Sequence, residues 1–206
     1  VEAYFAYVNA HGGVLHSHKL VLKSYDDQYS PAVSVQMTRK LIDQNHVFAE
    51  VAVNGSATNK ANLTVQTPAN VPVIGPQTGA DFLQPFQRNV YNVWPAYTIE
   101  GRLLASYGTH HLHLKRIGVL YQNDDFGKSL LNGVNATKIN TVAQVPYDAT
   151  QTDFSPAVQQ LKGNNADGVI ILAIPGATTK FLQAMVAVSY NPVRLMSQVA
   201  AIPEQF

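Results

Sequence analysis

Two apolar stretches in the second half of the chain decide the fold: Arg116-Ile117-Gly118-Val119-Leu120-Tyr121-Gln122 and Gly168-Val169-Ile170-Ile171-Leu172-Ala173-Ile174. Each has the length and apolar content of a strand. Apolar residues at helical spacing follow both stretches, over 127–137 and 178–190. Strands that are separated by single helices predict right-handed βαβ crossovers and a parallel sheet.

The same alternation of strands and helices extends in both directions from these stretches. Further strands are expected over 19–25, 47–53, 71–75, 90–93, 141–146 and 193–199, and further helices over 1–10, 31–41, 57–65, 98–107 and 155–161. The predicted fold class is α/β, with two doubly wound parallel-sheet lobes.

The run from Tyr107 to His113 interrupts the pattern. We therefore expect a first lobe over 1–110, a second lobe over 111–206 and a hinge near 107–115. The first lobe lacks the strand that normally precedes an opening helix. The second lobe is short, so both ends of the fold are expected to be incomplete.

The composition excludes several classes of function and chemistry. The chain has 206 residues, of which 46% are apolar, so it can bury a core. Its net charge of +1 gives no basic excess for nucleic acid. It has no Cys, which excludes disulfides, thiolate catalysis and Cys-ligated metal. No apolar run approaches the roughly 20 residues that span a bilayer, and no signal peptide opens the sequence, so an exported protein would be a mature form.

Ligands of open parallel sheets lie beyond the carboxyl ends of the strands. The loops expected there are rich in Gly and small hydroxyl residues, which let helix-start N–H groups approach an anion such as a carboxylate. Three aromatic residues of these loops could form apolar walls or pack in the core, and three hydroxyl residues could bind a ligand or only cap helices. The aromatic residues are Trp94, Tyr97 and Phe126; the hydroxyl residues are Ser56, Thr78 and Thr98.

Other polar residues carry weaker hypotheses. Asp26 and Asp27 could serve as acid and base or bind a cation, but a turn closed by their side chains is favoured. The histidines at 110, 111 and 113, and those at 11, 16 and 18, could bind metal, but a solvated surface is favoured. Glu50 lies in a strand that is expected to be buried. It therefore needs a partner or a raised pKa, unless it faces outward on an edge strand. Phosphate-loop, dinucleotide-binding and nucleophile-elbow motifs are absent from the sequence.

Several stretches together resemble one family, the type I solute-binding proteins of ABC importers, in the leucine/isoleucine/valine-binding branch. In the first half these are Asn9-Ala10-His11-Gly12-Gly13-Val14, Tyr25-Asp26-Asp27-Gln28-Tyr29-Ser30-Pro31, Lys40-Leu41-Ile42, Val47-Phe48 and Val71-Pro72-Val73-Ile74. In the second half they are residues 116–121, Asp125-Phe126-Gly127, Thr152-Asp153-Phe154-Ser155, Val158 and Leu161-Lys162. Their order and spacing over nearly the whole chain make the resemblance specific.

The resemblance implies two lobes that close on a small solute, with no enzymatic activity and no cofactor. It implies ligand contacts at Gly55, Ser56, Ala57, Gln77 and Thr78 in the first lobe, with hydroxyls and N–H groups holding a carboxylate. It also implies contacts at Tyr97 and, in the second lobe, at Phe126, Ile174 and Pro175. Amino-acid binders often carry Asp at the position of Tyr97, and Val199 and Ala200 stand where an acidic partner for the ammonium group is expected. The expected ligand is therefore an amino acid, an amide or a carboxylic acid.

The resemblance also implies a membrane permease of the ABC type as partner, and a periplasmic or cell-surface location after export. A receptor or sensor domain of the same fold is the alternative. An enzyme would need a nucleophile–base pair or a set of metal ligands at the strand ends, which the sequence does not supply.

Overall fold

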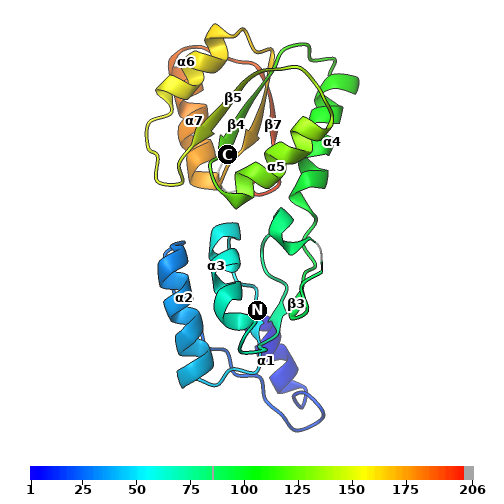
Figure 1. Ribbon diagram of the computed structural model, residues 1–206, viewed down its shortest axis with the longest axis vertical. Coiled ribbons are helices and arrows are strands. Elements are labelled where there is room, and N and C mark those ends of the chain that lie inside the picture. Colours follow the sequence, from blue (N-terminus) through cyan, green and yellow to red (C-terminus); the bar gives the residue numbers. More distant parts are fainter. Residues whose placement is uncertain (85, 202–206) are drawn as a thin grey trace. The chain divides into compact units, whose positions relative to one another are not determined.

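The structure is a computed structural model that describes residues 1–84 and 86–201, and its internal contacts divide the chain into two compact units (Figure 1). Unit 1 comprises Val1–Thr78 and Leu83–Trp94, and unit 2 comprises Gly79–Phe82 and Pro95–Phe206. This division differs from the predicted hinge near 107–115. Among the described residues, no helix is long and apolar enough to cross a membrane.

Unit 2 contains a four-stranded parallel sheet in the order β5-β4-β6-β7. The α/β class with parallel sheets is thus confirmed, and the two stretches that predicted it form the two central strands. The strands are β4 (Ile117–Gln122), β5 (Thr141–Tyr147), β6 (Gly168–Leu172) and β7 (Val193–Met196). The helices are α4 (Tyr97–His110), α5 (Asp125–Ala136), α6 (Ser155–Gly163) and α7 (Pro175–Ala187).

Helices cover both faces of this sheet (Figure 1). Helices α6 and α7 pack on one face, where Phe154 and Phe181 join a core cluster with Leu120 and Ile171 of the strands. Helices α4 and α5 lie on the other face. Because both faces are covered, the central strands are apolar along nearly their whole length.

The close packing of α4 against α5 explains why the division precedes residue 107. A Cβ atom on Gly101 of α4 would lie 1.9 Å from the carbonyl oxygen of Leu130, and one on Gly133 of α5 would lie 2.1 Å from that of Thr98. The two backbones therefore touch where they cross. Residues 107–110 form the last turn of α4, so the run that interrupts the apolar pattern lies inside unit 2.

Unit 1 has helices α1 (Glu2–Ala10), α2 (Pro31–Arg39) and α3 (Ser56–Gln66), and a π-helical turn η1 (Lys40–Gln44). Its parallel sheet has the order β1-β2-β3 and is formed by β1 (Glu50–Val51), β2 (Val73–Ile74) and β3 (Val90–Tyr91). A short 3-10 helix, η2 (Asp81–Leu83), follows β2. The predicted strands over 47–53, 71–75 and 90–93 are present but shorter.

The prediction of a strand over 19–25 is wrong. These residues form no strand in the structure, and they pair with no strand among the described residues. The backbone of Leu20 is instead hydrogen-bonded to the side chain of Asn9. Asn9 Oδ1 accepts from the Leu20 N–H at 2.7 Å, and Asn9 Nδ2 donates to the Leu20 carbonyl oxygen at 2.8 Å. An alternating pattern needs a neighbouring strand before it becomes part of a sheet.

Glu50 is buried, with 4% of its surface exposed, although β1 lies at one end of the sheet of unit 1. Burial raises the pKa of its carboxyl, while hydrogen bonds from Gln66 of α3 and Thr38 of α2 lower it by less. The Gln66 Nε2 group donates to Glu50 Oε2 at 2.7 Å. Among the described residues, the other side-chain oxygen of each of these two residues has no partner.

We predict that Gly101→Ala destabilises the chain by at least about 1–3 kcal/mol, because its new methyl group forces α4 and α5 apart. Chemical unfolding monitored by circular dichroism measures the loss. Gly163→Ala is the matched control, since Gly163 ends α6 and a Cβ atom there has open space. Equal stability of the two variants would contradict the close packing.

We predict that the stability of the chain falls relative to that of Glu50→Gln as the pH rises. The raised pKa means that folding favours neutral Glu50, so its contribution is complete below the unfolded-state pKa and is lost as the pH rises through the folded-state pKa. Glutamine keeps the neutral shape at every pH. Urea unfolding across a pH series tests this, with the exposed Asp43→Asn as control. A parallel pH dependence in the wild type and in Glu50→Gln would refute the prediction.

Candidate functional site

Unit 1 brings together all five of its predicted ligand residues. The N–H of Gln77 donates to the carbonyl oxygen of Val53 at 2.8 Å, and Asn54 pairs with Gln77 in an isolated parallel bridge. The loop after β1 and the loop after β2 therefore run side by side at the carboxyl end of the sheet. This arrangement follows from parallel strand pairing, because neighbouring strands end at the same edge.

Ser56 and Thr78 form the centre of this arrangement. Their hydroxyl oxygens lie 2.7 Å apart, and either can be the donor. Ser56 is 1% exposed and Thr78 is 0% exposed, so the pair is held in a fixed position rather than moving in solvent. Ser56 is the first residue of α3, which sets the pair at the beginning of a helix.

The beginning of α3 is built to leave N–H groups available. Its N-cap is Gly55, which has no side chain to accept from them. The first helical hydrogen bond runs from Asn59 N to the carbonyl oxygen of Gly55, 3.2 Å apart, so the three N–H groups of residues 56–58 have no acceptor within the helix. The side chains of Thr58 and Asn59 instead donate to carbonyl oxygens of residues 53–55. An anion is the natural partner for such a helix start.

Gly55 is required here for two reasons. Its φ of 91° and ψ of 148° lie near a region that only glycine adopts readily. A Cβ atom at this position would also lie 2.5 Å from the ring of Tyr29 and 2.8 Å from Thr58 Oγ1. Tyr29, which the sequence analysis did not select as a site residue, thus sets the path of the backbone into α3.

The other predicted residues of unit 1 are more open. Ala57 is half-buried and Gln77 is exposed. Sequence analysis missed Asn92, whose Nδ2 group donates to the carbonyl oxygen of Thr78 at 3.2 Å and whose Oδ1 accepts from the N–H of Trp94 at 2.9 Å. No motif distinguishes this asparagine in the sequence.

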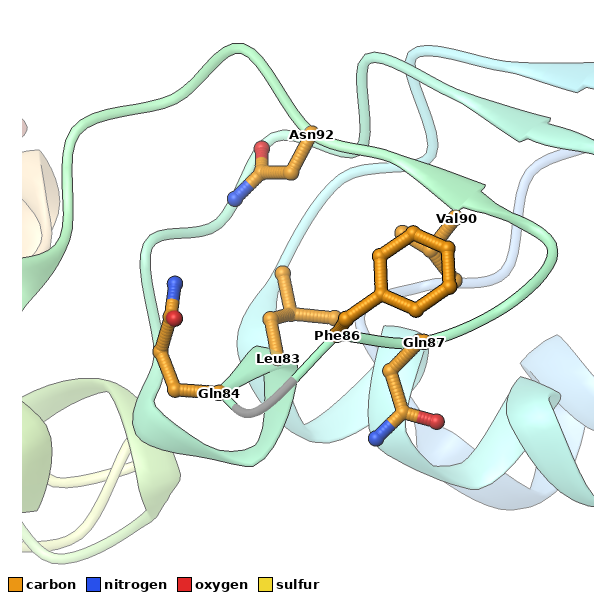
Figure 2. Close-up of a pocket in the computed structure, with 6 residues that line it drawn as sticks. All are labelled: Leu83, Gln84, Phe86, Gln87, Val90 and Asn92. Atoms are coloured by element: carbon orange, nitrogen blue, oxygen red, sulfur yellow. The ribbon is translucent and has the colours of Figure 1, made fainter.

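A hollow of about 250 Å³ lies in unit 1 beside Asn92, and Figure 2 shows the side chains around it. The residues that line it are Leu83, Gln84, Phe86, Gln87, Val90 and Asn92. Phe86 is 80% exposed, so the hollow is open rather than enclosed. None of the predicted ligand residues lines it.

In unit 2, Tyr97 and Phe126 pack against each other, with ring centres 5.2 Å apart and an interplanar angle of 78°. They are only 2% and 3% exposed, which favours the core-packing interpretation of both rings. Ile174 and Pro175 are half-buried and form the N-cap and first residue of α7. Thr98 does not cap α4: the N-cap is Ala96, and the Thr98 hydroxyl donates to the Asp81 carboxylate.

Further polar groups gather at the carboxyl edge of the unit 2 sheet. The carboxylate of Asp124 caps α5 by accepting from the N–H groups of Phe126 and Gly127. Glu100 of α4 accepts from the N–H of Gln198 at 2.6 Å, in the loop after β7, and burial raises the pKa of the Glu100 carboxyl. The acid that faces this loop therefore comes from a helix about 100 positions earlier, where sequence spacing gave no signal.

Among the weaker hypotheses, hydrogen bonds bear directly on that of Asp26 and Asp27. Asp26 and Asp27 accept from the N–H groups of Gln28 and Tyr29, which is the turn that the sequence favoured. No group of three metal-binding side chains occurs among residues 1–84 and 86–201. His111 stacks on Tyr107 at the end of α4.

One family model matches the chain. A family model described as periplasmic binding protein matches residues 1–204. No curated protein matches the chain. Among solved structures, the LivJ substrate-binding protein of a branched-chain amino acid transporter from Streptococcus pneumoniae, in complex with isoleucine, has a TM-score of 0.88 and 21% identity, over 96% of this chain and 57% of its own.

Two other solved structures show the same fold with different solutes in their descriptions. A solute-binding protein of an ABC transporter from R. palustris, in complex with 4-hydroxybenzoate, has a TM-score of 0.84 and 16% identity, over 98% of this chain and 58% of its own. A fatty acid ABC transporter substrate-binding protein from Thermomonospora curvata has a TM-score of 0.88 and 18% identity, over 99% of this chain and 53% of its own. The chain thus spans little more than half the length of these relatives.

We predict that Gly55→Ala destabilises the chain, because the alanine methyl group would overlap the Tyr29 ring and an alanine would be strained at the backbone angles of this position. The expected loss is about 1–3 kcal/mol in urea unfolding. The control is Gly176→Ala, in the first turn of α7, where a Cβ atom meets nothing within 4 Å. A loss no larger than that of the control would contradict the role assigned to Gly55.

Proposed function

Since the chain belongs to the periplasmic binding protein family, we propose that it is the solute-binding component of an ABC importer and that it binds its solute through a carboxylate group. It delivers the solute to a permease in the membrane and does not transform it chemically. Its place of action is the periplasm or the outer cell surface. That the solute lies between two lobes stays a prediction of the resemblance.

One observation carries the carboxylate assignment: the hydroxyl pair of Ser56 and Thr78 at the beginning of α3. One of the two hydroxyls donates to the other, and the pair lies beside the N–H groups of residues 56–58, which are hydrogen-bond donors at the positive end of a helix dipole. A carboxylate has two oxygens that accept hydrogen bonds and carries the negative charge that such a helix end favours. The neutral amide group offers one acceptor oxygen and no charge, which supports an acid over an amide.

The solutes named for the structural relatives fit this chemistry. Isoleucine, 4-hydroxybenzoate and fatty acids differ in size and shape, but all three carry a carboxylate. Because only isoleucine also carries an ammonium group, the carboxylate is the feature common to the set. The proposal for this chain therefore specifies the carboxylate group of the solute and leaves the rest of the solute open.

A thermal-shift screen of the full chain tests the proposal, with isoleucine, 4-hydroxybenzoate and a medium-chain fatty acid as probes. Each acid is paired with its amide, for example 4-hydroxybenzoate with 4-hydroxybenzamide. An acid present at about 100 times its Kd adds about 2.7 kcal/mol of stability. A rise in melting temperature with at least one acid and not with its amide supports the proposal. No response to any acid, or equal responses to acid and amide, rejects it.

We predict that Ser56→Ala and Thr78→Val each weaken binding of the best acid by about 1–3 kcal/mol, because each removes a buried hydroxyl at the carboxylate position. Isothermal titration calorimetry measures the change. Thr64→Val is the control: it lies on the same helix, and its hydroxyl donates to the carbonyl oxygen of Ala61 on the exposed side. Unchanged affinity in both site variants would remove the hydroxyl pair from the site.

A further inference from the structure

A single phenol joins three loops at the carboxyl edge of the unit 2 sheet. Tyr147 ends β5 and is 2% exposed. Its hydroxyl donates to Gln122 Oε1 at the end of β4, 2.8 Å away, and accepts from the N–H of Ile174, 3.1 Å away, before α7. The ring itself packs in the core beside Phe154, with ring centres 5.4 Å apart.

The chain of hydrogen bonds continues from Gln122 to the beginning of α5. Gln122 is fully buried, and its Nε2 group donates to Asp124 Oδ2 at 2.6 Å. The other carboxylate oxygen of Asp124 accepts from the N–H groups of Phe126 and Gly127 at 3.0 and 3.2 Å. The N–H groups that begin α5 are thereby linked to the N–H that precedes α7.

The direction of every bond in this chain is fixed by chemistry. The Ile174 N–H can only donate, so the phenol oxygen accepts from it and sends its one proton to Gln122 Oε1. The Gln122 amide must then direct its NH₂ group toward Asp124, whose carboxylate can only accept. A change at either end therefore alters the neighbouring hydrogen bonds as well, because linked hydrogen bonds polarise one another.

We propose that Tyr147 is a positioning residue of the solute site: its hydroxyl fixes the beginnings of α5 and α7, which carry the predicted ligand residues Phe126, Ile174 and Pro175, relative to each other. The part of this proposal that concerns solute binding rests on the proposed function. Its structural part, the coupling of two helix beginnings within unit 2, stands on the hydrogen bonds alone. Tyr147 acts through these loops and is not assigned a contact with the solute.

Tyr147→Phe separates positioning from packing. The ring and its contact with Phe154 remain, while the Ile174 N–H and the buried Gln122 Oε1 each lose a partner. The matched control is Tyr190→Phe. Tyr190 lies beyond the C-terminal end of α7, and its hydroxyl donates to the carbonyl oxygen of Ala166 at 2.9 Å, before β6 begins. Tyr147→Phe loses two phenol hydrogen bonds at the carboxyl edge, whereas Tyr190→Phe loses one away from that edge.

The first readout is amide hydrogen exchange of the ligand-free full chain, followed by NMR. Tyr147→Phe is expected to speed exchange at residues 126, 127 and 174, whereas Tyr190→Phe leaves these amides unchanged. Residues 126 and 127 lie about 20 positions from the substitution, so faster exchange there reports the hydrogen-bond chain rather than local packing. Unchanged exchange at 126 and 127 overturns the proposal, whether or not any solute binds.

The second readout is calorimetric affinity for the acid that gives the largest thermal shift in the wild type. Tyr147→Phe is expected to raise Kd about tenfold or more, and Tyr190→Phe less than twofold. Equal Kd changes in the two variants overturn the role in binding. Failure of the wild type to bind any acid rejects the proposed function and leaves the exchange experiment as the test of positioning.

A second variant guards against loss of folding. Asp124→Asn keeps an oxygen for the cap of α5 but places an NH₂ group opposite the NH₂ of Gln122, so a hydrogen bond between them needs the Gln122 amide to turn over and give up its acceptor role toward Tyr147. This variant is expected to speed amide exchange at residue 174, at the other end of the series of hydrogen bonds, as Tyr147→Phe does. No change at residue 174 in this variant contradicts the coupling.

Discussion

Backbone N–H groups at the beginning of a helix have no acceptor inside that helix, and a parallel sheet gathers several such beginnings at one edge. This constraint shapes the carboxyl edge of both units. In unit 2 the beginning of α5 is satisfied from within, because the Asp124 carboxylate accepts from two of its N–H groups. In unit 1 the beginning of α3 follows Gly55, which has no side chain to do the same. The beginning of α5 is thus capped by a side chain of its own sequence, whereas the beginning of α3 has no side-chain cap.

The two units also differ in what fills their interiors. Unit 2 has a large apolar cluster between its sheet and helices α6 and α7. Unit 1 has strands of two residues and a buried polar set between α2, α3 and β1, in which Asn62 donates to Ser34 at 2.9 Å and Gln66 donates to Glu50. Directional bonds of this kind lose their energy when a group changes protonation or orientation, whereas apolar contacts do not. The interior of unit 1 therefore depends more on directional hydrogen bonds than that of unit 2 does.

Sequence patterns predicted the helices and the strands of unit 2 well, because apolar periodicity reports burial against a neighbouring layer. They predicted the loops at the carboxyl edge for the same reason. They failed at 19–25, since an alternating pattern says nothing about whether a partner strand is present. The close packing of α4 against α5 at Gly101 and Gly133 also leaves no periodic signal, and the hinge near 107–115 stays a prediction. In the sequence, Tyr147 is only the residue that follows a predicted strand. Its hydroxyl has a role because Gln122 and Ile174 lie within hydrogen-bond distance of it.

The short segment Gly79–Phe82 belongs to unit 2, although unit 1 resumes directly after it and continues to Trp94. Within unit 2, the Asp81 carboxylate holds Thr98 of α4 and Asn132 of α5, and its N–H donates to Ser129 at 3.0 Å. Unit 2 is therefore not a continuous piece of the chain. Its native contacts close a loop that contains the last part of unit 1, and closing that loop costs entropy before the contacts repay it. The two units are thus expected to fold as coupled partners rather than one after the other.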